Sequence, residues 1–152
     1  MTFAIQANAL VRAFGDKNAV DGIDLAVSTG EIYGFLGPNG AGKSTTVRML
    51  TTLLRPTSGT ATVAGYDVKN QPELVRLHIG VALQDAALDP KQTGRELLDL
   101  QARLYGLSAA ERERRVKELL SLVDIGDAMD RRIGTYSGGM KRRLDLAAAL
   151  VH

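Results

Sequence analysis

Cysteine is absent from this 152-residue sequence, and histidine occurs only twice, at His78 and His152. Without cysteine the chain can form no disulfide, no catalytic thiolate and no cysteine-based zinc site, and this composition is compatible with a reducing cytoplasm. Two histidines are too few for a histidine-rich metal centre. The sequence also lacks a long apolar run and a basic N-terminus followed by an apolar stretch, so it predicts neither a membrane span nor a signal peptide.

An excess of charge of one sign is also missing. The formal net charge is +2, which is too small to predict nucleic-acid binding. Basic residues cluster at 112–115 and 141–143 on helical patterns, and the first cluster is typical of a solvated helix face. Hydrophobic residues make up 45% of the chain and charged residues 24%, as in ordinary globular proteins, and the length suffices for one domain with a core.

The most informative segment that is present is Gly37–Thr45, which reads GPNGAGKST and matches the phosphate-binding pattern G-x-x-x-x-G-K-[ST]. A loop that wraps phosphates turns its backbone N–H groups inward, and side chains at the closest approach would block it. Glycines leave that space and permit positive φ, while a proline stiffens the entry to the loop. The residues in question are Gly37, Gly40, Gly42 and Pro38.

Two side chains of this motif carry its chemistry. Lys43 can reach the β- and γ-phosphates of a nucleotide, and the hydroxyl of Ser44 is placed to ligate the Mg²⁺ that bridges them. The helix predicted to begin here adds the positive end of its dipole. The pattern alone also allows a glycine-rich turn that matches by accident, on the order of once in a hundred such sequences.

The flanking sequence favours a real phosphate site. Glu31–Leu36 predicts a buried strand that leads into the loop, and Lys43–Leu54 predicts a helix because its apolar residues lie three and four apart. Strand, loop and helix are the order that the motif requires. The sequence therefore predicts a nucleotide phosphate site.

Further strands and one short helix are predicted around this unit. Alternation over residues 23–28 predicts a half-buried strand, and Thr60–Ala64 predicts a short one. Pro72–Leu77 suits a short helix with proline in its first turn. Ile79–Leu83 predicts a buried strand that ends at Gln84.

Beyond residue 84 the patterns become helical. Leucines at helical spacing predict a helix over Gly94–Tyr105, with Gly106 as its C-cap. A capping box formed by Ser108 and Glu111 opens a second helix, which runs through Val123.

A final helix starts near Ser137 and is expected still to be running at His152. Part of its apolar surface is expected to lack cover, because such a helix normally packs against a strand that follows it. This surface consists of a stripe, Leu144, Ala147, Ala148 and Val151, with Leu146 and Leu150 on an adjoining face.

A second motif, Tyr136–Lys141 (YSGGMK), opens that last helix. Ser137 is a natural N-cap, and Gly138 and Gly139 bare the backbone N–H groups of the helix N-terminus, which makes a second anion site. Taken alone, the motif also fits an ordinary capped helix start. In a chain that has a phosphate loop, two such helix N-termini indicate two halves of nucleotide sites that dimerisation completes.

With these motifs the sequence resembles the ATP-binding subunits of ABC transporters. GPNGAGKST is similar to their Walker A motif, YSGGMK to their LSGGQ-type signature, and Gln84 to the glutamine of their Q-loop. The resemblance runs from about Phe3 to the last residue. It is strongest to the daunorubicin/doxorubicin-resistance type of drug exporter, through the phrases YGFLGPNGAGKSTTVRMLTTLLRPTSGTATVAGYDV and YSGGMKRRLDLAAALV.

The resemblance implies an α/β fold, a P-loop NTPase core of ABC type with an N-terminal β subdomain and a helical insertion, in which the C-terminal part of the core sheet is missing. Residues 1–152 would form a partial nucleotide-binding domain. Within it, residues 1–84 would hold the β subdomain and P-loop core, 85–135 the helical subdomain, and 136–152 the signature motif and following helix.

The family also implies roles for individual residues. Phe14 would stack on adenine, where tyrosine is commoner, although a phenylalanine in the core is the alternative. Gln84 would sense the metal and the attacking water and link to the membrane partner; without the resemblance it is merely a solvated polar residue at a strand end. Lys43 and Gln84 would be catalytic, and Ser44 and Gln84 would ligate Mg²⁺.

The signature would contact the γ-phosphate that the opposite subunit binds. Tyr136 and Met140 replace the usual leucine and glutamine, and the Ser-Gly-Gly core is intact. The full nucleotide-contacting set that the resemblance implies is Phe14, Gly37, Pro38, Asn39, Gly40, Ala41, Gly42, Lys43, Ser44, Thr45, Thr46, Ser137, Gly138 and Gly139.

The implied function is that of an ATP-binding exporter subunit that uses ATP and Mg²⁺, forms a homodimer of nucleotide-binding domains and drives a separate transmembrane permease. It would be cytoplasmic and peripheral on the inner face of the membrane, with no nucleic-acid partner. The Walker B aspartate, catalytic glutamate and switch histidine would follow His152, so the chain is expected to be truncated and inactive alone. The alternatives are a non-hydrolytic nucleotide-binding fragment and, less favoured, a soluble ABC ATPase acting on ribosomes or DNA.

Overall fold

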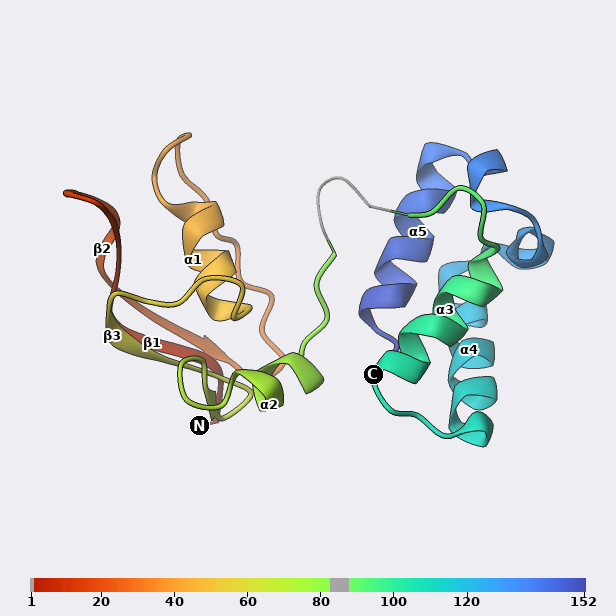
Figure 1. Cartoon of the computed structure of the whole chain (residues 1–152), viewed down its shortest axis with the longest axis horizontal. Coiled ribbons are helices and arrows are strands. Elements are labelled where there is room, and N and C mark those ends of the chain that lie inside the picture. The colour runs from red at the N-terminus through yellow and green to blue at the C-terminus, as the bar shows by residue number, and fades with distance from the viewer. Residues whose placement is uncertain (1, 83–87) are drawn as a thin grey trace. The chain divides into compact units, whose positions relative to one another are not determined.

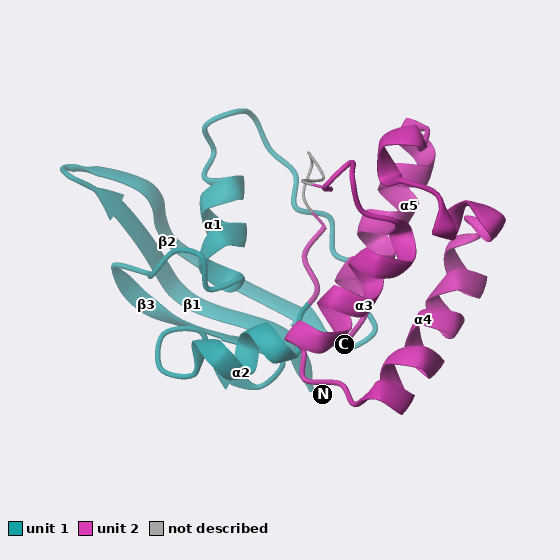
Figure 2. Ribbon diagram, turned by 45° about the vertical axis from the view of Figure 1, so that its right-hand side comes forward, with its two compact units in different colours: residues 1–79 teal, residues 80–152 magenta. Residues whose placement is uncertain are grey.

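The computed structural model describes residues 2–82 and 88–152. The chain divides into two compact units, residues 1–79 and residues 80–152 (Figure 2). The first unit contains the β-strands and the phosphate loop, and the second is helical.

A four-stranded antiparallel sheet forms the first unit, in the order β2-β1-β3-β4 (Figure 1). The strands are β1 (Phe3–Phe14), β2 (Lys17–Ser28), β3 (Ser58–Val63) and β4 (Tyr66–Asp67). In β2, Leu25 and Val27 are buried while Asp24 and Ala26 are exposed, which confirms the half-buried strand predicted over 23–28.

Two helices accompany this sheet, α1 (Lys43–Leu50) and α2 (Pro72–Leu77). The predicted bounds of α2 are confirmed. Helix α1 packs on the sheet through Met49 and Leu50. The expectation that it continues to residue 54 is wrong, because Thr52 adopts a left-handed φ of 62° that ends the helical path.

Two predicted buried strands are absent from the described residues. Residues 31–36 form no strand and are all exposed, with Ile32 at 101% and Leu36 at 92% of their reference areas. Residues 79–82 also lie outside any strand, and Leu83 lies outside the described residues. A strand exists through its hydrogen-bonded neighbours, and no described strand pairs with either segment. The apolar pattern of each segment indicated a buried strand, but it could not show whether another strand would pair with that segment.

The second unit contains three helices and two short 3₁₀ turns, as far as its described residues go. They are α3 (Gly94–Leu104), α4 (Ala109–Val123), η1 (Gly126–Asp130), η2 (Ile133–Thr135) and α5 (Gly138–Ala149). The capping box of Ser108 and Glu111 is confirmed, and Gly106 follows α3 in the left-handed region, with φ of 77°. A second capping box, formed by Thr93 and Glu96, opens α3.

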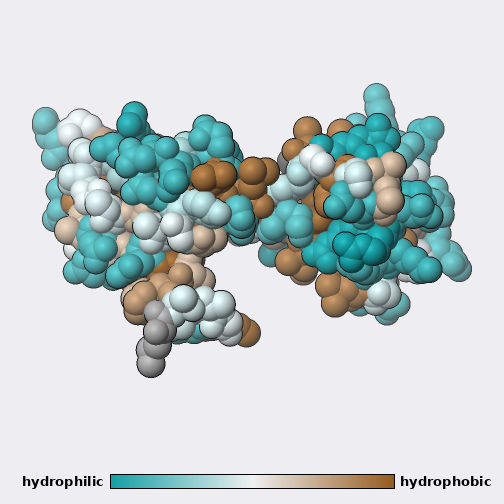
Figure 3. Space-filling view, turned by 90° about the horizontal axis from the view of Figure 1, so that it is seen from below, coloured by the Kyte–Doolittle hydropathy of each residue, from teal (hydrophilic) through white to brown (hydrophobic). Residues whose placement is uncertain are grey.

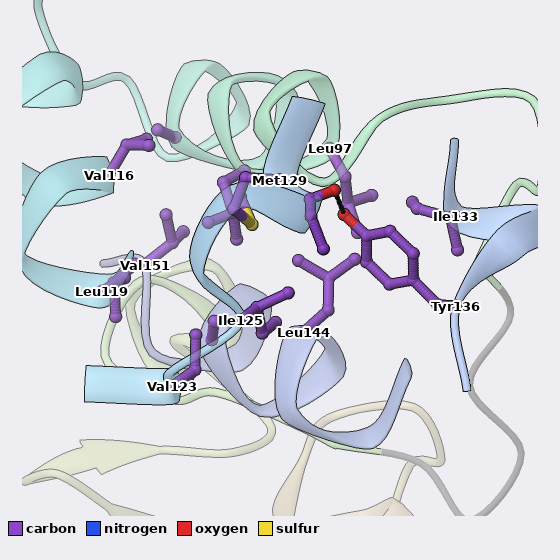
Figure 4. Packing of buried hydrophobic residues seen from close by; sticks show 14 residues of the cluster. Leu97, Val116, Leu119, Val123, Ile125, Met129, Ile133, Tyr136, Leu144 and Val151 are labelled. Atoms are coloured by element: carbon purple, nitrogen blue, oxygen red, sulfur yellow. Dashed lines mark hydrogen bonds between the residues drawn. The ribbon is translucent and has the colours of Figure 1, made fainter. Parts of the chain in front are cut away.

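Helix α5 ends at Ala149, so the expectation that it runs to His152 is wrong. The expectation that part of its apolar surface lacks cover holds for Leu146 and Leu150, which are 43% and 46% exposed, but is wrong for the stripe. Leu144, Ala147 and Val151 are fully buried in one cluster with residues of α3 and α4 (Figure 4). The stripe therefore finds its cover within the helical unit itself.

Two arginines tie α4 and α5 together at their C-terminal ends. Arg115 of α4 donates from Nη2 to the carbonyl oxygens of Leu150, at 2.6 Å, and His152, at 3.2 Å. Arg143 of α5 donates from Nη1 to the carbonyl oxygen of Asp124, at 2.9 Å. Each guanidinium donates to carbonyl groups at or beyond a helix C-terminus, which have no intrahelical partners. The positive charge of each arginine also interacts favourably with the negative end of a helix dipole. The two contacts fix the antiparallel register of α4 and α5.

Candidate functional site

The phosphate loop precedes α1 and depends on glycine at two points. Gly40 and Gly42 have φ of 82° and 83°, a backbone conformation that residues with a Cβ rarely adopt. At Gly42 an added Cβ would also collide with the carbonyl oxygen of Ala19 and lie 3.1 Å from Cγ2 of Val20. Glycine at position 42 therefore lets the start of α1 seat directly on β2.

A β-bulge forms the seat. Pairing between β1 and β2 passes from Arg12–Val20 to Ala13–Asn18, so β2 contributes one residue more than β1, namely Ala19. A bulge leaves the extra residue outside the ladder and bends its strand, and bulges are frequent beside functional sites. Here the carbonyl group of the extra residue faces the loop.

Lys43 folds back across the loop that it follows. Its ammonium Nζ donates to the carbonyl oxygens of Gly37 and Pro38, each at 2.6 Å. These contacts hold the cation over the entry of the loop and beside the N-terminus of α1. The ammonium is thus held within the loop, and its contact with phosphate oxygens stays a prediction.

The first turn of α1 presents backbone donors. The first intrahelical acceptor is the carbonyl of Gly42, which receives the N–H of Thr46 at 2.8 Å. The N–H groups of residues 43–45 precede this bond and have no acceptor inside the helix. Ser44 is exposed, whereas Thr46 is 2% exposed and donates from its hydroxyl to Gly42 at 3.1 Å. Thr46 thus stabilises the turn, and its contact with a nucleotide stays a prediction.

Phe14 lies at the end of β1 and is 52% exposed, so the alternative of a core phenylalanine is wrong. It pairs with Lys17, which is two residues from Ala19 on β2. Two residues span about 7 Å of strand. The exposed ring thus lies on the strand pair that carries the bulge at Ala19, and its contact with a nucleotide stays a prediction.

The second predicted anion site lies at the N-terminus of α5. Ser137 is the N-cap, and its Oγ accepts from the N–H of Met140 at 3.3 Å. Gly138 and Gly139 are exposed. A Cβ at Gly138 would meet no heavy atom of the described residues within 4 Å, and one at Gly139 would meet only Ser137 Oγ, at 4.0 Å. Packing among the described residues therefore gives no reason for either glycine.

Tyr136 anchors the segment that leads into this helix. The side chain is 5% exposed, and its hydroxyl donates to the carbonyl oxygen of Ala128 at 2.6 Å, as Figure 4 shows. Burial raises the pKa of this phenol above its ordinary value. A Cβ on Gly94 would lie 2.7 Å from the Tyr136 hydroxyl and 2.9 Å from Sδ of Met129. From the sequence, Tyr136 was noted only as a departure from the family motif. Its contacts with positions 94 and 128 could not be predicted, because no local sequence pattern connects the three positions.

Gln84 lies outside the described residues, so its predicted metal and catalytic roles have no structural counterpart here. Of the two predicted Mg²⁺ ligands, the structure describes Ser44. Residues 2–82 and 88–152 contain no cluster of three or more His, Cys, Asp or Glu side chains that could hold a metal ion. The predicted roles of Ser44 and Gln84 as Mg²⁺ ligands stay predictions.

The family described as ABC transporter matches residues 20–152, and the chain belongs to this family. It is 53% identical over 150 residues to the daunorubicin/doxorubicin resistance ATP-binding protein DrrA of Streptomyces peucetius, covering 99% of this chain and 46% of that protein. It is 45% identical to the doxorubicin resistance ATP-binding protein DrrA of Mycobacterium tuberculosis, covering 97% of this chain and 45% of that protein. The chain thus spans about half the length of these relatives.

Solved structures agree with this assignment. The chain superposes on one described as the ATP-binding subunit of an ABC transporter with a TM-score of 0.86 and 30% identity. It also superposes on CbiO1 from Clostridium perfringens, part of the ABC transporter complex CbiONQ, with a TM-score of 0.87 and 25% identity. In each case 99% of this chain and 62% of the other are covered. The α/β fold of an ABC ATP-binding subunit is confirmed.

No helix in the described part of the chain is long and apolar enough to cross a membrane.

Proposed function

We propose that this chain is the nucleotide-binding part of an ABC-type drug exporter, which binds ATP with Mg²⁺ and couples ATP binding and hydrolysis to transport through a separate membrane subunit. One observation carries the proposal. The loop before α1 combines left-handed glycines, the Lys43 ammonium and the bare N–H groups of a helix N-terminus in one place. The similarity to the DrrA proteins, whose names describe ATP-binding proteins of daunorubicin and doxorubicin resistance, supports the assignment to drug exporters.

Each part of the loop has a defined task in this proposal. The backbone N–H groups of residues 40–45 would surround the phosphates, and Lys43 would exchange its two carbonyl contacts for β- and γ-phosphate oxygens. Ser44 would place its hydroxyl on Mg²⁺, which supplies charge neutralisation between the two phosphates. Phe14 would hold the base from the side.

The signature would complete the site of a second copy. Gly138 and Gly139 have no packing role among the described residues, and glycine weakens a helix by about 1 kcal/mol relative to alanine. Close approach of an anion to the helix N-terminus would explain both residues. The proposal therefore includes a homodimer in which each signature faces the phosphate loop of the other copy. This dimer would be peripheral to the membrane that contains the permease.

Calorimetry of Mg-ATP binding to Lys43→Ala tests the proposal. Losing a charge-assisted phosphate contact should cost about 1.5–3 kcal/mol, which is roughly ten- to a hundredfold in affinity. Lys69→Ala removes the same charge from an exposed position of the same unit and should bind ATP as the wild type does. Equal affinities for Lys43→Ala and the wild type would show that this loop does not bind phosphate.

A further inference from the structure

Arg12 lies directly against Phe14 in a way that the phosphate motif does not require. Its guanidinium carbon sits 4.6 Å from the centroid of the Phe14 ring. Its Nη1 donates to the carbonyl oxygen of Arg55 at 2.8 Å. Its Nε is buried and has no hydrogen-bond partner among the residues that the structure describes.

The guanidinium is held in this position from two sides. The segment at residues 55–57 is fastened to the end of β1, because Thr57 donates its N–H to Val11 at 2.9 Å and accepts from the N–H of Ala13 at 3.0 Å. This fixes the Arg55 carbonyl that Arg12 binds. The backbone on both sides of Arg12 is thus tied down, and so is its head group.

The position of Arg12 leaves its Nε unpaired among the described residues, which is unfavourable, and the bond of Nη1 to Arg55 and the contact with the Phe14 ring favour that position. A guanidinium over one face of an aromatic ring is attracted to the negative face of the π-system. That face of Phe14 is therefore covered by Arg12, while the side chain remains half exposed. Because Arg12 takes one face of the ring, a group that stacks on Phe14 must use the other.

We infer that Arg12 is a positioning residue for nucleotide binding, which holds Phe14 so that the free face of the ring stacks on the nucleobase. The inference rests on the proposed function, since it needs a nucleotide in the phosphate loop. A cation on one face draws electron density from the ring and improves its stacking on an electron-rich purine. Stacking reads no hydrogen-bonding edge, so ATP and GTP should bind with similar affinity.

The test compares two ligands on the full chain by calorimetry, Mg-ATP and Mg-tripolyphosphate, because the second has no base. Arg12→Met should weaken ATP binding by about three- to tenfold and leave tripolyphosphate binding unchanged. Lys69→Met, the matched control for the lost charge, should change neither. Arg12→Lys keeps a cation near the ring without the planar group, so its ATP affinity should fall between those of Arg12→Met and the wild type.

The double variant separates positioning from independent contact. If Arg12 acts through the ring, Arg12→Met should have little further effect in a Phe14→Ala background. Unchanged ATP affinity in Arg12→Met, equal loss for both ligands, or additive effects of the two substitutions would each overturn the inference.

Failure of the proposed function gives a different result. A wild-type chain that binds neither ligand, or a Lys43→Ala chain that binds tripolyphosphate normally, would overturn the phosphate site itself and the role of Arg12 with it. Normal loss in Lys43→Ala together with normal ATP binding in Arg12→Met would overturn only the positioning role.

Discussion

The two units of this chain bury their apolar side chains to different degrees. The helical unit places the stripes of α3, α4 and α5 in one cluster that includes Leu98, Leu119 and Leu144, each at most 1% exposed. The β unit has its own core under the sheet, yet the segment at residues 31–36 leaves four large apolar residues at the surface. Figure 3 shows apolar side chains at the surface of both units.

This difference follows from where backbone hydrogen bonds are made. A helix satisfies its N–H and C=O groups within itself, so its apolar stripe needs only a neighbouring surface. A strand satisfies them on another strand, so an apolar segment without a partner has neither ladder nor cover. The stripes of α3, α4 and α5 thus share one core, although Leu104 and Leu122 stay exposed, whereas residues 31–36 have no described partner strand.

The largest expected effect separates the units by one matched substitution. Leu98→Ala removes a fully buried side chain from the helical core and should lower the free energy of unfolding by about 2–5 kcal/mol. Leu36→Ala changes an exposed side chain of the β unit and should stay within about 0.5 kcal/mol. Denaturant unfolding measures both variants, and hydrogen exchange of residues 94–149 shows whether the loss in Leu98→Ala lies in the helical unit. A comparable loss in Leu36→Ala would mean that residues 31–36 are covered in solution.

The second prediction contrasts two glycines within the helical unit. Gly94→Ala places a methyl group against the Tyr136 hydroxyl and Met129, and such overpacking should cost about 1–3 kcal/mol. Gly138→Ala meets no described neighbour and should leave stability unchanged or raise it by up to about 1 kcal/mol. Thermal unfolding of the two variants measures the difference. Equal destabilisation would show that Gly138 has a packing role, and would weaken the argument for an anion site at α5.

The smallest effect is a dependence of the helical unit on acid. Desolvation tends to raise the pKa of Asp99, but hydrogen bonds from Arg103 and Arg112 outweigh it and hold the pKa below its usual range. The hydrogen bond from Arg95 likewise lowers the pKa of Asp130. A carboxylate with a depressed folded pKa contributes stability above its unfolded pKa of about 4, and this is lost as the pH falls through the folded value. Asp145 acts in the opposite direction, because burial raises its pKa despite Arg142.

Hydrogen exchange of residues 94–149 should therefore show less protection as the pH is lowered from about 5 to about 3. Asp99→Asn, which cannot titrate, should reduce this dependence, with the Glu73→Gln variant on the exposed pair with Arg76 as a control in the other unit. Undiminished acid sensitivity in Asp99→Asn would show that the ion pairs of Asp99 do not link pH to the stability of this unit.

Features that depend on a few adjacent residues were predictable from the sequence. The capping box of Ser108 and Glu111, the left-handed Gly106 and the bounds of α2 all follow from neighbours within one turn. The phosphate-loop motif could be recognised for the same reason, because its glycines, lysine and hydroxyls lie within nine residues, and its contacts with a nucleotide stay a prediction. For the same reason Ser137 was recognisable as an N-cap.

Features that join distant positions were not predictable. Three such features are visible only in the structure. They are the bulge at Ala19 against which Gly42 packs, the close approach of Gly94 to the Tyr136 hydroxyl, and the guanidinium of Arg12 over the ring of Phe14. The same reason explains a prediction that was wrong. The apolar pattern at 31–36 indicated a buried strand, but the pattern contains no information about which strand would pair with it.

The sequence by itself determined which residues form the phosphate-loop motif and where the helices begin, since both depend on local backbone chemistry and on the spacing of a few side chains. Only the tertiary structure decided which apolar faces are covered and how the ring of Phe14 is held. Burial and cross-strand contact depend on pairs of residues that lie far apart along the chain. The residue pattern of one segment does not reveal which other segment it contacts.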